Sequence, residues 1–361
     1  MWLDWGIIII FVAISILILN YLVVVAWSRL SEDTTTELES TPVEGFTSQT
    51  QLSQSKTSGK SGELEESDES QSDAVKSRYE WLRGQDIYDD FYAKIYPKIT
   101  QFHKILQSEM AVIMAEWRNN PSTDPKNMAI LDVGCGTGVA AATMVKMGAG
   151  KVIGLDESAA MIRYARDKTL PSTTLSESEK ELVEFRNMNA YSPSALNGGE
   201  VSHIYMTYFS IYYFHDMTTL FRNLAYWCRP GGKLAIEVVD KYRFEAIPDS
   251  SNPWVGINPQ RYKKERITKG TVEFDRFTYK TEFNLYDPRA EFNETFRFKD
   301  GTVRRHKHEL YMYDIQKIVE MAGEAGWKFD KSAELMPFGF PHAFIIFFTR
   351  TSGHLPSLET Q

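Results

Sequence analysis

Three glycines and one downstream aspartate are the residues of this chain whose spacing points most directly to chemistry. Gly134, Gly136 and Gly138 stand at alternate positions after an apolar run, residues 129–133, and Asp156 ends the next apolar run. Glycines at a strand-to-helix turn let a ligand approach the backbone closely. An acidic residue twenty positions after Gly136 has the spacing at which a carboxylate accepts from ribose hydroxyls. The pattern predicts a site for an adenine-containing ligand.

The position of the third glycine separates two kinds of ligand site. A dinucleotide fingerprint needs that glycine at position 139, which is Val139. Residues 132–138, Asp-Val-Gly-Cys-Gly-Thr-Gly, instead resemble the first motif of the class I S-adenosylmethionine-dependent methyltransferases. Residues 228–232, Cys-Arg-Pro-Gly-Gly, and the following residues 233–239 are similar to a turn and a fifth strand of that family. The resemblance covers roughly residues 85–350 and implies an enzyme whose cofactor is S-adenosyl-L-methionine.

The resemblance also implies how the glycine turn holds the cofactor. Gly134, Gly136 and Gly138 would admit its methionyl part, and Asp132 would orient their loop. Asp156 would accept from both ribose hydroxyls; the alternative is that it only caps the helix that follows.

Four further residues complete the expected cofactor site. Asn189 and Ala190 follow the third predicted strand, where the family often places an Asp against the adenine amino group. Asn189 departs from that pattern, although its carbonyl oxygen still accepts hydrogen bonds. Tyr88 and Tyr92 lie in a segment that resembles one folding over the cofactor in the family; packing of an amphipathic helix on the sheet edge is the other interpretation.

Methyl transfer is an in-line displacement that needs a positioned nucleophile and often a base. Candidates at the carboxyl end of the fourth predicted strand are Tyr208 and His215, together with Tyr212 and Tyr213. His306 and His308 alternate on a later predicted strand, so both face one side and either could be the base. Aromatic packing remains the alternative for each. No cysteine pair or carboxylate cluster joins the histidines in the sequence, so no metal site is predicted.

The predicted fold is Rossmann-like α/β, with a seven-stranded mostly parallel sheet. Its strands alternate with helical patterns, and one strand of a closing pair after the helix 314–325 runs antiparallel to the rest. The expected strands that can be bounded are residues 129–133, 151–156, 182–188, 203–209, 233–239 and 342–350. An antiparallel β insert, residues 241–312, is expected to cover the substrate side with three strands, 271–285, 290–298 and 302–312.

An N-terminal transmembrane helix is predicted before this domain. Residues 6–27 carry no charge, and 22 residues span about 33 Å as a helix, enough for a bilayer core. Trp2, Trp5 and Trp27 supply interfacial aromatics. We expect a retained single-pass anchor rather than a cleaved signal peptide, with the catalytic domain in the cytoplasm.

The expected organisation is therefore an anchor (1–30), a disordered acidic linker (31–77), a methyltransferase domain (78–350) and a flexible tail (351–361). Twelve acidic and four basic residues lie in 31–80, so the catalytic region is neutral, and no nucleic-acid partner is expected. Cys135 and Cys228 are expected to be packed thiols.

These features predict a membrane-anchored methyltransferase that acts on a small-molecule or lipid-like acceptor. A protein methyltransferase is the alternative among enzymes. A catalytically silent scaffold or binding protein with the same fold is the alternative from another class, which the intact glycines and Asp156 disfavour.

Overall fold

The computed structural model describes residues 81–100, 103–119, 124–247 and 265–352. The chain divides into two compact units, residues 1–65 and 66–361. The first unit, with the predicted membrane segment 6–27, lies outside the described residues, as do the linker 31–77 and the tail beyond 352. Among the residues that are described, no helix is both long and apolar enough to cross a membrane.

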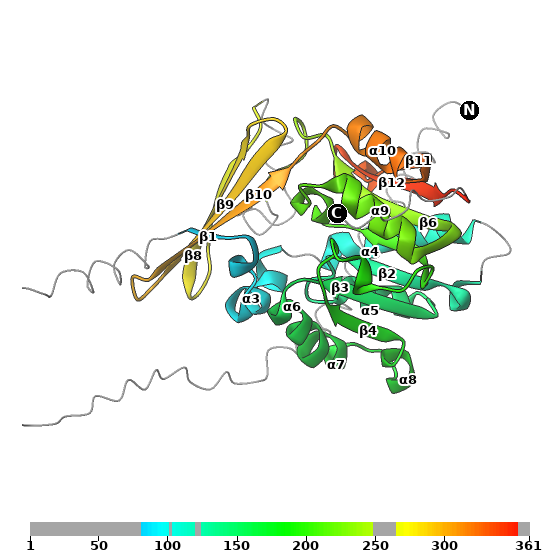
Figure 1. Ribbon diagram of the computed structural model, residues 1–361. Helices are drawn as coiled ribbons and strands as arrows, with labels where there is room; N and C mark the ends of the chain where they lie inside the picture. Colours follow the sequence, from blue (N-terminus) through cyan, green and yellow to red (C-terminus); the bar gives the residue numbers. More distant parts are fainter. Residues whose placement is uncertain (1–80, 101–102, 120–123, 248–264, 353–361) are drawn as a thin grey trace, which may run out of the picture. The chain divides into compact units, whose positions relative to one another are not determined.

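A seven-stranded sheet carries the domain, in the spatial order β11-β12-β6-β5-β2-β3-β4 (Figure 1). The strands are β2 (Ala129–Val133), β3 (Lys151–Asp156), β4 (Val183–Asn187), β5 (Val201–Met206), β6 (Cys228–Val239), β11 (Trp327–Glu334) and β12 (Ala343–Arg350). All neighbouring pairs among the first five are parallel, and β12 is antiparallel to both β6 and β11. This arrangement confirms the predicted mostly parallel sheet with one reversed strand.

The order of the strands determines where ligands bind. The chain moves outward from β2 to β3 and β4, then crosses to β5 on the other side of β2 and continues outward to β6. Because parallel crossovers are right-handed, the helices of the two halves cover opposite faces of the sheet. The direction reverses between β2 and β5, and open α/β sheets bind ligands at the carboxyl ends of the strands at such a point.

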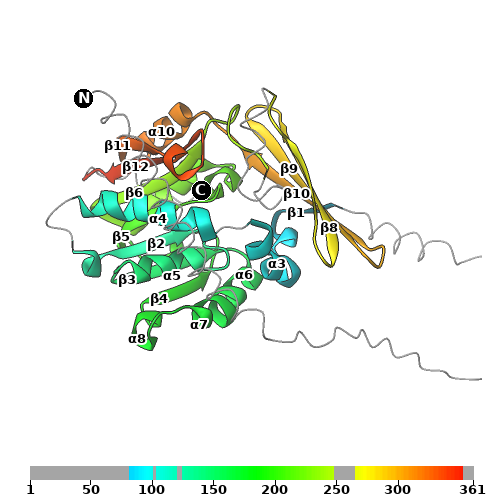
Figure 2. The ribbon, with the colours of Figure 1, turned by 180° about the vertical axis from the view of Figure 1, so that it is seen from behind.

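Helices flank the sheet in the order that the strand alternation predicts (Figures 1 and 2). They are α3 (Asp90–Thr100), α4 (His103–Arg118), α5 (Val139–Lys146), α6 (Ala159–Tyr164), α7 (Leu170–Ser172), α8 (Glu177–Lys180), α9 (Met217–Trp227) and α10 (Ile315–Glu324). The apolar runs of β2, β3 and β5 are buried in one core with the inner faces of these helices. Cys135 and Cys228 are buried free thiols in this core, as expected.

The strand after residue 200 differs from its prediction. β5 ends at Met206, whereas the sequence pattern placed the strand at 203–209. Tyr208 and Phe209 have φ values of 53° and 64°, which no strand can accommodate. The aromatic residues after Met206 therefore form a turn at the sheet edge, followed by the 3-10 segment Ser210–Tyr213.

The insert also differs from its prediction. It forms four strands instead of three, and they pair with a fifth strand that precedes the parallel sheet in the chain, in the order β1-β10-β9-β8-β7. The strands are β1 (Trp81–Arg83), β7 (Lys269–Glu273), β8 (Phe277–Leu285), β9 (Arg289–Phe298) and β10 (Val303–Tyr311). The predicted strand 271–285 is a hairpin that turns at residues 274–276, where no glycine or proline marks the turn. β1 joins β10 in parallel, a pairing between residues more than 200 positions apart.

A second hydrophobic cluster joins the insert to the parallel-sheet domain. Tyr279 and Phe296 from the insert pack with Ile87 and Tyr92 near and within α3, and with Met161 of α6. The segment that carries Tyr88 is thus held between the two sheets.

Gly138 is a position where only glycine fits. Its φ is +79°, and a Cβ there would lie 2.5 Å from the Phe185 ring and 2.8 Å from Ala165 Cβ. We expect Gly138→Ala to lower the free energy of unfolding by about 2–4 kcal/mol, because overpacking and backbone strain each cost roughly 1–3 kcal/mol. The measurement is urea unfolding of the full-length protein.

Gly301→Ala is the matched control for that substitution. Gly301 also has a positive φ, +86°, but nothing lies within 4 Å of the Cβ position. It should show the strain alone, so equal losses in the two variants would refute the packing role of Gly138.

Candidate cofactor and acceptor site

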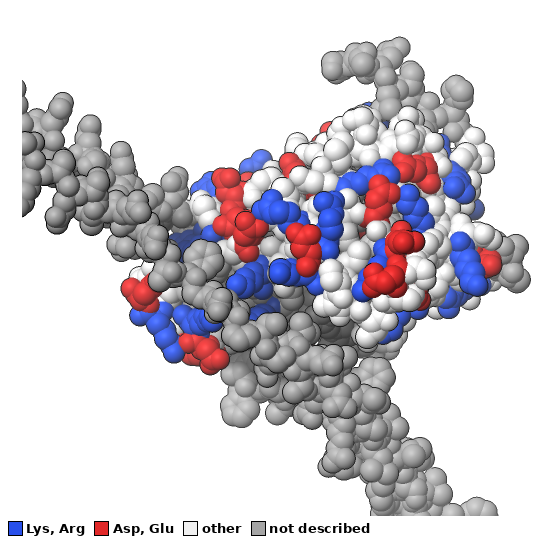
Figure 3. Space-filling view, turned by 90° about the horizontal axis from the view of Figure 1, so that it is seen from below, with Lys and Arg blue, Asp and Glu red and all other residues white. Residues whose placement is uncertain are grey.

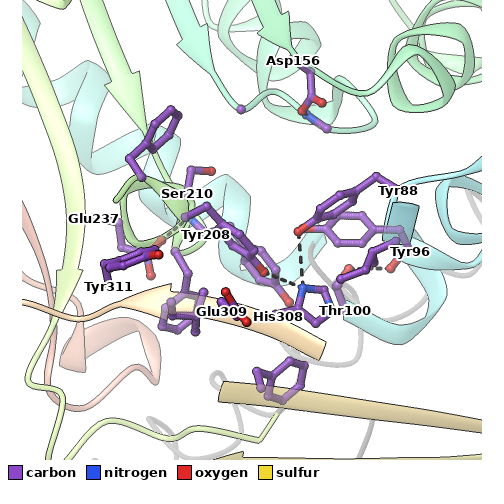
Figure 4. A pocket seen from close by; sticks show the side chains of 18 of the residues that line it. Tyr88, Tyr96, Thr100, Asp156, Tyr208, Ser210, Glu237, His308, Glu309 and Tyr311 are labelled. Carbon is purple, nitrogen blue, oxygen red and sulfur yellow. Dashed lines mark hydrogen bonds between the residues drawn. The ribbon is translucent and has the colours of Figure 1, made fainter. Parts of the chain in front are cut away.

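One cavity of about 490 Å³ lies at the carboxyl edge of the seven-stranded sheet, between this edge, α3 and the insert. Figure 4 shows Asp156 at one side, the β10 residues His308, Glu309 and Tyr311 at the opposite side, and Tyr88 and Tyr96 along a third. Ten of the thirteen predicted site residues line it: Tyr88, Tyr92, Gly134, Gly136, Asp156, Asn189, Ala190, Tyr208, His215 and His308. Asp132, Gly138 and His306 do not.

The glycine turn forms a cradle that a ligand can enter. Gly134 and Gly136 line the cavity with φ values of +74° and +51°. A Cβ on Gly136 would meet no atom within 4 Å, so the space beside this backbone is open to a ligand. A Cβ on Gly134 would make a tight contact, 3.0 Å from Ser210 Oγ, and the positive φ at this position favours glycine. The predicted contact with the methionyl part of the cofactor is therefore possible for Gly134 and Gly136, which line the cavity, whereas Gly138 packs against Phe185 and Ala165.

Asp156, the last residue of β3, connects this strand to the glycine turn. Its Oδ2 accepts from the Gly136 N–H at 2.9 Å, and its Oδ1 accepts from the Ser158 N–H at 2.8 Å. Burial raises the pKa of Asp156 to about 6. Each carboxylate oxygen keeps a further lone pair, so both ribose hydroxyls can donate to it. Ser158, whose Oγ accepts from the Met161 N–H at 3.1 Å, is the N-cap of α6, and the capping alternative for Asp156 is wrong.

Asp132 is buried outside the cavity lining, whereas Asn189 and Ala190, which follow β4, line the cavity. Asp132 is 2% exposed within β2, and burial raises its pKa to about 7. Its role in orienting the glycine loop stays a prediction. Asn189 Oδ1 accepts from the Tyr191 N–H at 2.7 Å, which leaves its amide group free to face the cavity. The Ala190 carbonyl accepts from Asn223 Nδ2 at 2.9 Å.

Tyr88 and Tyr92 form a cap over the cofactor end of the cavity. Ser158 Oγ donates to the Tyr88 carbonyl at 2.6 Å, which ties this segment to the Asp156 loop. The two rings meet edge to face, with centroids 5.6 Å apart. The residues pack against the insert and also line the cavity, so packing is confirmed and the contact with the cofactor stays a prediction.

The turn after β5 presents Tyr208 to the acceptor side. The buried Glu237 Oε2, at the end of β6, accepts from the Tyr208 N–H and so stabilises the two left-handed residues (Figure 4). Burial raises the pKa of Glu237 to about 7. Tyr212 has the packing role: it is fully buried, and its hydroxyl accepts from the Val239 N–H at 2.9 Å.

His308 and His306, expected as equivalent candidates, lie in different surroundings. His308 lines the cavity, and its Nδ1 lies 3.0 Å from the Tyr213 hydroxyl and 3.4 Å from the Tyr88 hydroxyl. His306 is fully buried, and its Nε2 accepts from Arg304 Nε at 2.6 Å. Since the lone pair of His306 is already engaged away from the cavity, the structure does not place His306 as a base.

His215 is the remaining predicted candidate. It lies at the exposed rim of the cavity, with Nδ1 3.2 Å from the Tyr191 hydroxyl and its ring centroid 6.0 Å from that of Tyr311. His215 thus contacts Tyr191 and Tyr311, whereas His308 contacts Tyr213 and Tyr88.

Glu294 is the functional residue that sequence reasoning missed. Its Oε2 lies 2.9 Å from both His306 Nδ1 and His308 Nε2, and its Oε1 accepts from the Tyr279 hydroxyl at 2.5 Å. A carboxylate does join the histidines, contrary to the expectation from spacing alone. The β9–β10 hairpin places Glu294 directly opposite His306, so pairing the two predicted strands across their turn could have found it.

Residues 130–232 match a sequence family described as a methyltransferase domain. No curated protein sequence matches the chain. Among solved structures, a methyltransferase from Streptomyces caelestis, CcbJ, is 15% identical with a TM-score of 0.53; the match covers 73% of this chain and 98% of that one. An S-adenosylmethionine-dependent methyltransferase from Clostridium acetobutylicum is 16% identical with a TM-score of 0.51, covering 73% of this chain and 99% of that one. At these identities the structures are similar in fold.

Proposed function

We propose that this chain, which carries a class I S-adenosylmethionine-dependent methyltransferase domain, methylates a small molecule bound between the parallel sheet and the insert. The family match and the shared fold confirm an enzyme of this class with S-adenosyl-L-methionine as cofactor. The acceptor and the membrane attachment are the parts that we propose.

The observation that carries the proposal is that one cavity joins the cofactor cradle to an acid–base group. Gly136 and Asp156 line one end, and His308 and Tyr311 line the other. Its volume, about 490 Å³, falls within the range of roughly 300–1,000 Å³ typical of small-molecule sites. Tyr88 and Tyr92 cover it on the third side, which suits a small acceptor better than a protein chain.

The lining also indicates the charge of the acceptor. Its described residues include fourteen aromatic side chains and six carboxylates, but neither lysine nor arginine. On the outer face in Figure 3, by contrast, Lys and Arg side chains are interspersed with Asp and Glu. A cavity with acids and without fixed cations favours an uncharged or cationic acceptor over one bearing phosphate or carboxylate groups.

The chemistry assigned to this chain is binding, orientation and proton transfer. S-adenosylmethionine supplies an electrophilic methyl carbon, which an acceptor atom attacks in line. Asp156 holds the ribose end, Tyr88 and Tyr92 exclude water, and His308 Nδ1 is the group that can receive the acceptor proton. Carboxylates around the cavity also suit the positive sulfonium.

An acceptor screen tests this function. Full-length protein with radiolabelled S-adenosylmethionine and fractionated cell extract should transfer label to compounds of low molecular mass. Label recovered only in protein would favour the alternative of a protein methyltransferase. Cofactor binding without labelling of any fraction would favour the scaffold.

We further propose that residues 6–27 anchor the enzyme in a membrane, with its catalytic domain on the cytoplasmic side. The support is the uncharged run of 22 residues and its flanking aromatics. Full-length protein should stay in the membrane pellet after alkaline carbonate washing, whereas a chain that begins at Ser31 should be released. Release of both would refute the anchor.

A further inference from the structure

Five side chains form a continuous hydrogen-bonded series from the exposed Asp89, just before α3, to the cavity. Asp89 Oδ2 accepts from Arg304 at 2.9 Å, and Arg304 Nε donates to His306 Nε2 at 2.6 Å. His306 Nδ1 and His308 Nε2 each lie 2.9 Å from Glu294 Oε2. The last member, His308, lines the cavity.

The first link determines the protonation of His306. A guanidinium group can only donate hydrogen bonds, so the nitrogen that faces it must carry a lone pair. The proton of His306 is therefore on Nδ1, which donates it to Glu294, and the ring is neutral. Burial, the largest effect, lowers the pKa of His306 and agrees with a neutral ring.

The second link keeps Glu294 ionised. Burial alone would raise the pKa of Glu294, but the hydrogen bonds from His306 and His308 hold it well below its usual range. An ionised carboxylate only accepts, so His308 must present its N–H through Nε2. In the neutral ring Nδ1 then carries the lone pair, and this atom lies 3.0 Å from the hydroxyl of Tyr213.

We propose that Arg304 and His306 are positioning residues that hold Glu294 as an anion and His308 as the tautomer whose Nδ1 lone pair faces the cavity. This inference rests on the proposed function and deepens it, because it assigns the direction in which the acceptor proton leaves. The acceptor must then carry that proton on its nucleophilic atom, as a hydroxyl or an amine does.

The transfer step balances with these groups. The acceptor O–H or N–H proton moves to His308 Nδ1, either directly or through the Tyr213 hydroxyl. In the second case the Tyr213 oxygen takes the acceptor proton while it donates its own proton to His308 Nδ1. The acceptor electron pair forms the bond to the methyl carbon while the carbon–sulfur bond breaks, its electrons remaining on sulfur. Glu294 balances the charge of the resulting imidazolium.

A metal ion is the competing interpretation of the same cluster. One ligand atom from each of Glu294, His306 and His308 lies within 4.8 Å of the others. However, the Arg304 guanidinium places a positive charge against His306, and every ring nitrogen of both histidines has a hydrogen-bond partner. The hydrogen-bonded series accounts for all these contacts without a cation.

Nitrogen NMR tests the assignment without an acceptor. In full-length protein labelled with ¹⁵N in its histidine rings, long-range ¹H–¹⁵N spectra should show the proton on Nδ1 of His306 and on Nε2 of His308. His306→Gln and His308→Ala assign the signals by removing them one at a time. The opposite tautomer in either residue, a doubly protonated His306, or signals that shift when a chelator is added would overturn the proposal.

Variants test the positioning role. Arg304→Met should change the His308 tautomer and lower kcat roughly 10–100-fold, the scale of residues that orient a reacting group, while cofactor affinity stays the same. Arg297→Met, an exposed arginine on β9, is the matched control and should change neither. His306→Gln should retain the His308 tautomer, since its amide can accept from Arg304 and donate to Glu294.

The outcomes separate this inference from the proposed function. An unaltered His308 tautomer in Arg304→Met would refute the positioning role even if methyl transfer occurs. The predicted tautomers together with no transfer to any acceptor would refute the proposed function and leave the series intact. If Arg304→Met does not fold, His306→Gln and the unmodified protein still decide the assignment.

Discussion

Replacement of His308 by alanine is expected to lower kcat roughly 10²–10⁴-fold, the typical loss when a positioned base is removed. His308 Nδ1 is a ring nitrogen that faces the cavity, and Glu294 stabilises the charge that it acquires. The expected cofactor contacts are at the ends of β2, β3 and β4 and on Tyr88 and Tyr92, and do not include His308, so affinity for S-adenosylmethionine should be unchanged. Single-turnover rates and calorimetry on the full-length protein measure the two effects separately.

Lys307→Ala is the control for this experiment. Lys307 is the adjacent residue of β10, and its side chain is directed to Glu291, with Nζ and Oε1 3.1 Å apart. It should leave both kcat and cofactor affinity unaltered. Normal turnover by His308→Ala would instead assign proton removal to another group, such as His215 or Glu237, or to none.

Replacement of Asp156 by alanine is expected to weaken cofactor binding by roughly 1.5–3 kcal/mol, or about 10–150-fold in Kd. The variant loses the acceptor for the ribose hydroxyls and also the bond from the Gly136 N–H that shapes the cradle. Calorimetry with the demethylated cofactor product measures this without turnover. Asp167→Ala, an exposed acid outside the cavity, is the matched control.

The pH dependence of binding provides a second measure of the same group. Burial raises the pKa of Asp156 to about 6, so the group is protonated below that pH and ionised above it. Only the ionised form accepts through all its lone pairs. Affinity of the unmodified protein should therefore rise as pH increases through about 6, and this rise should be absent in Asp156→Ala. An equal rise in both proteins would show that Asp156 does not contact the ribose.

Local patterns in the sequence were enough to predict the parallel sheet and the cofactor half of the site. β2 and β3 are short apolar runs, β4 alternates apolar and polar residues, and each strand formed close to where its pattern predicts. The glycine turn and Asp156 could be paired from spacing alone, because one βαβ unit brings the carboxyl ends of two adjacent strands together. The class of cofactor could thus be predicted without knowledge of any tertiary contact.

The acid–base end of the cavity was decided only by tertiary structure. The alternation makes His306 and His308 equivalent, yet His306 is hydrogen-bonded to Arg304 and His308 lines the cavity. Glu294 reaches both through strand register, and β1 joins the insert across more than 200 residues. Periodicity reports which face a side chain takes, and pairing the predicted hairpin strands could have placed Glu294 opposite His306. Burial and tautomer, however, depend on what covers the hairpin, and these long-range contacts leave no local signal in the chain.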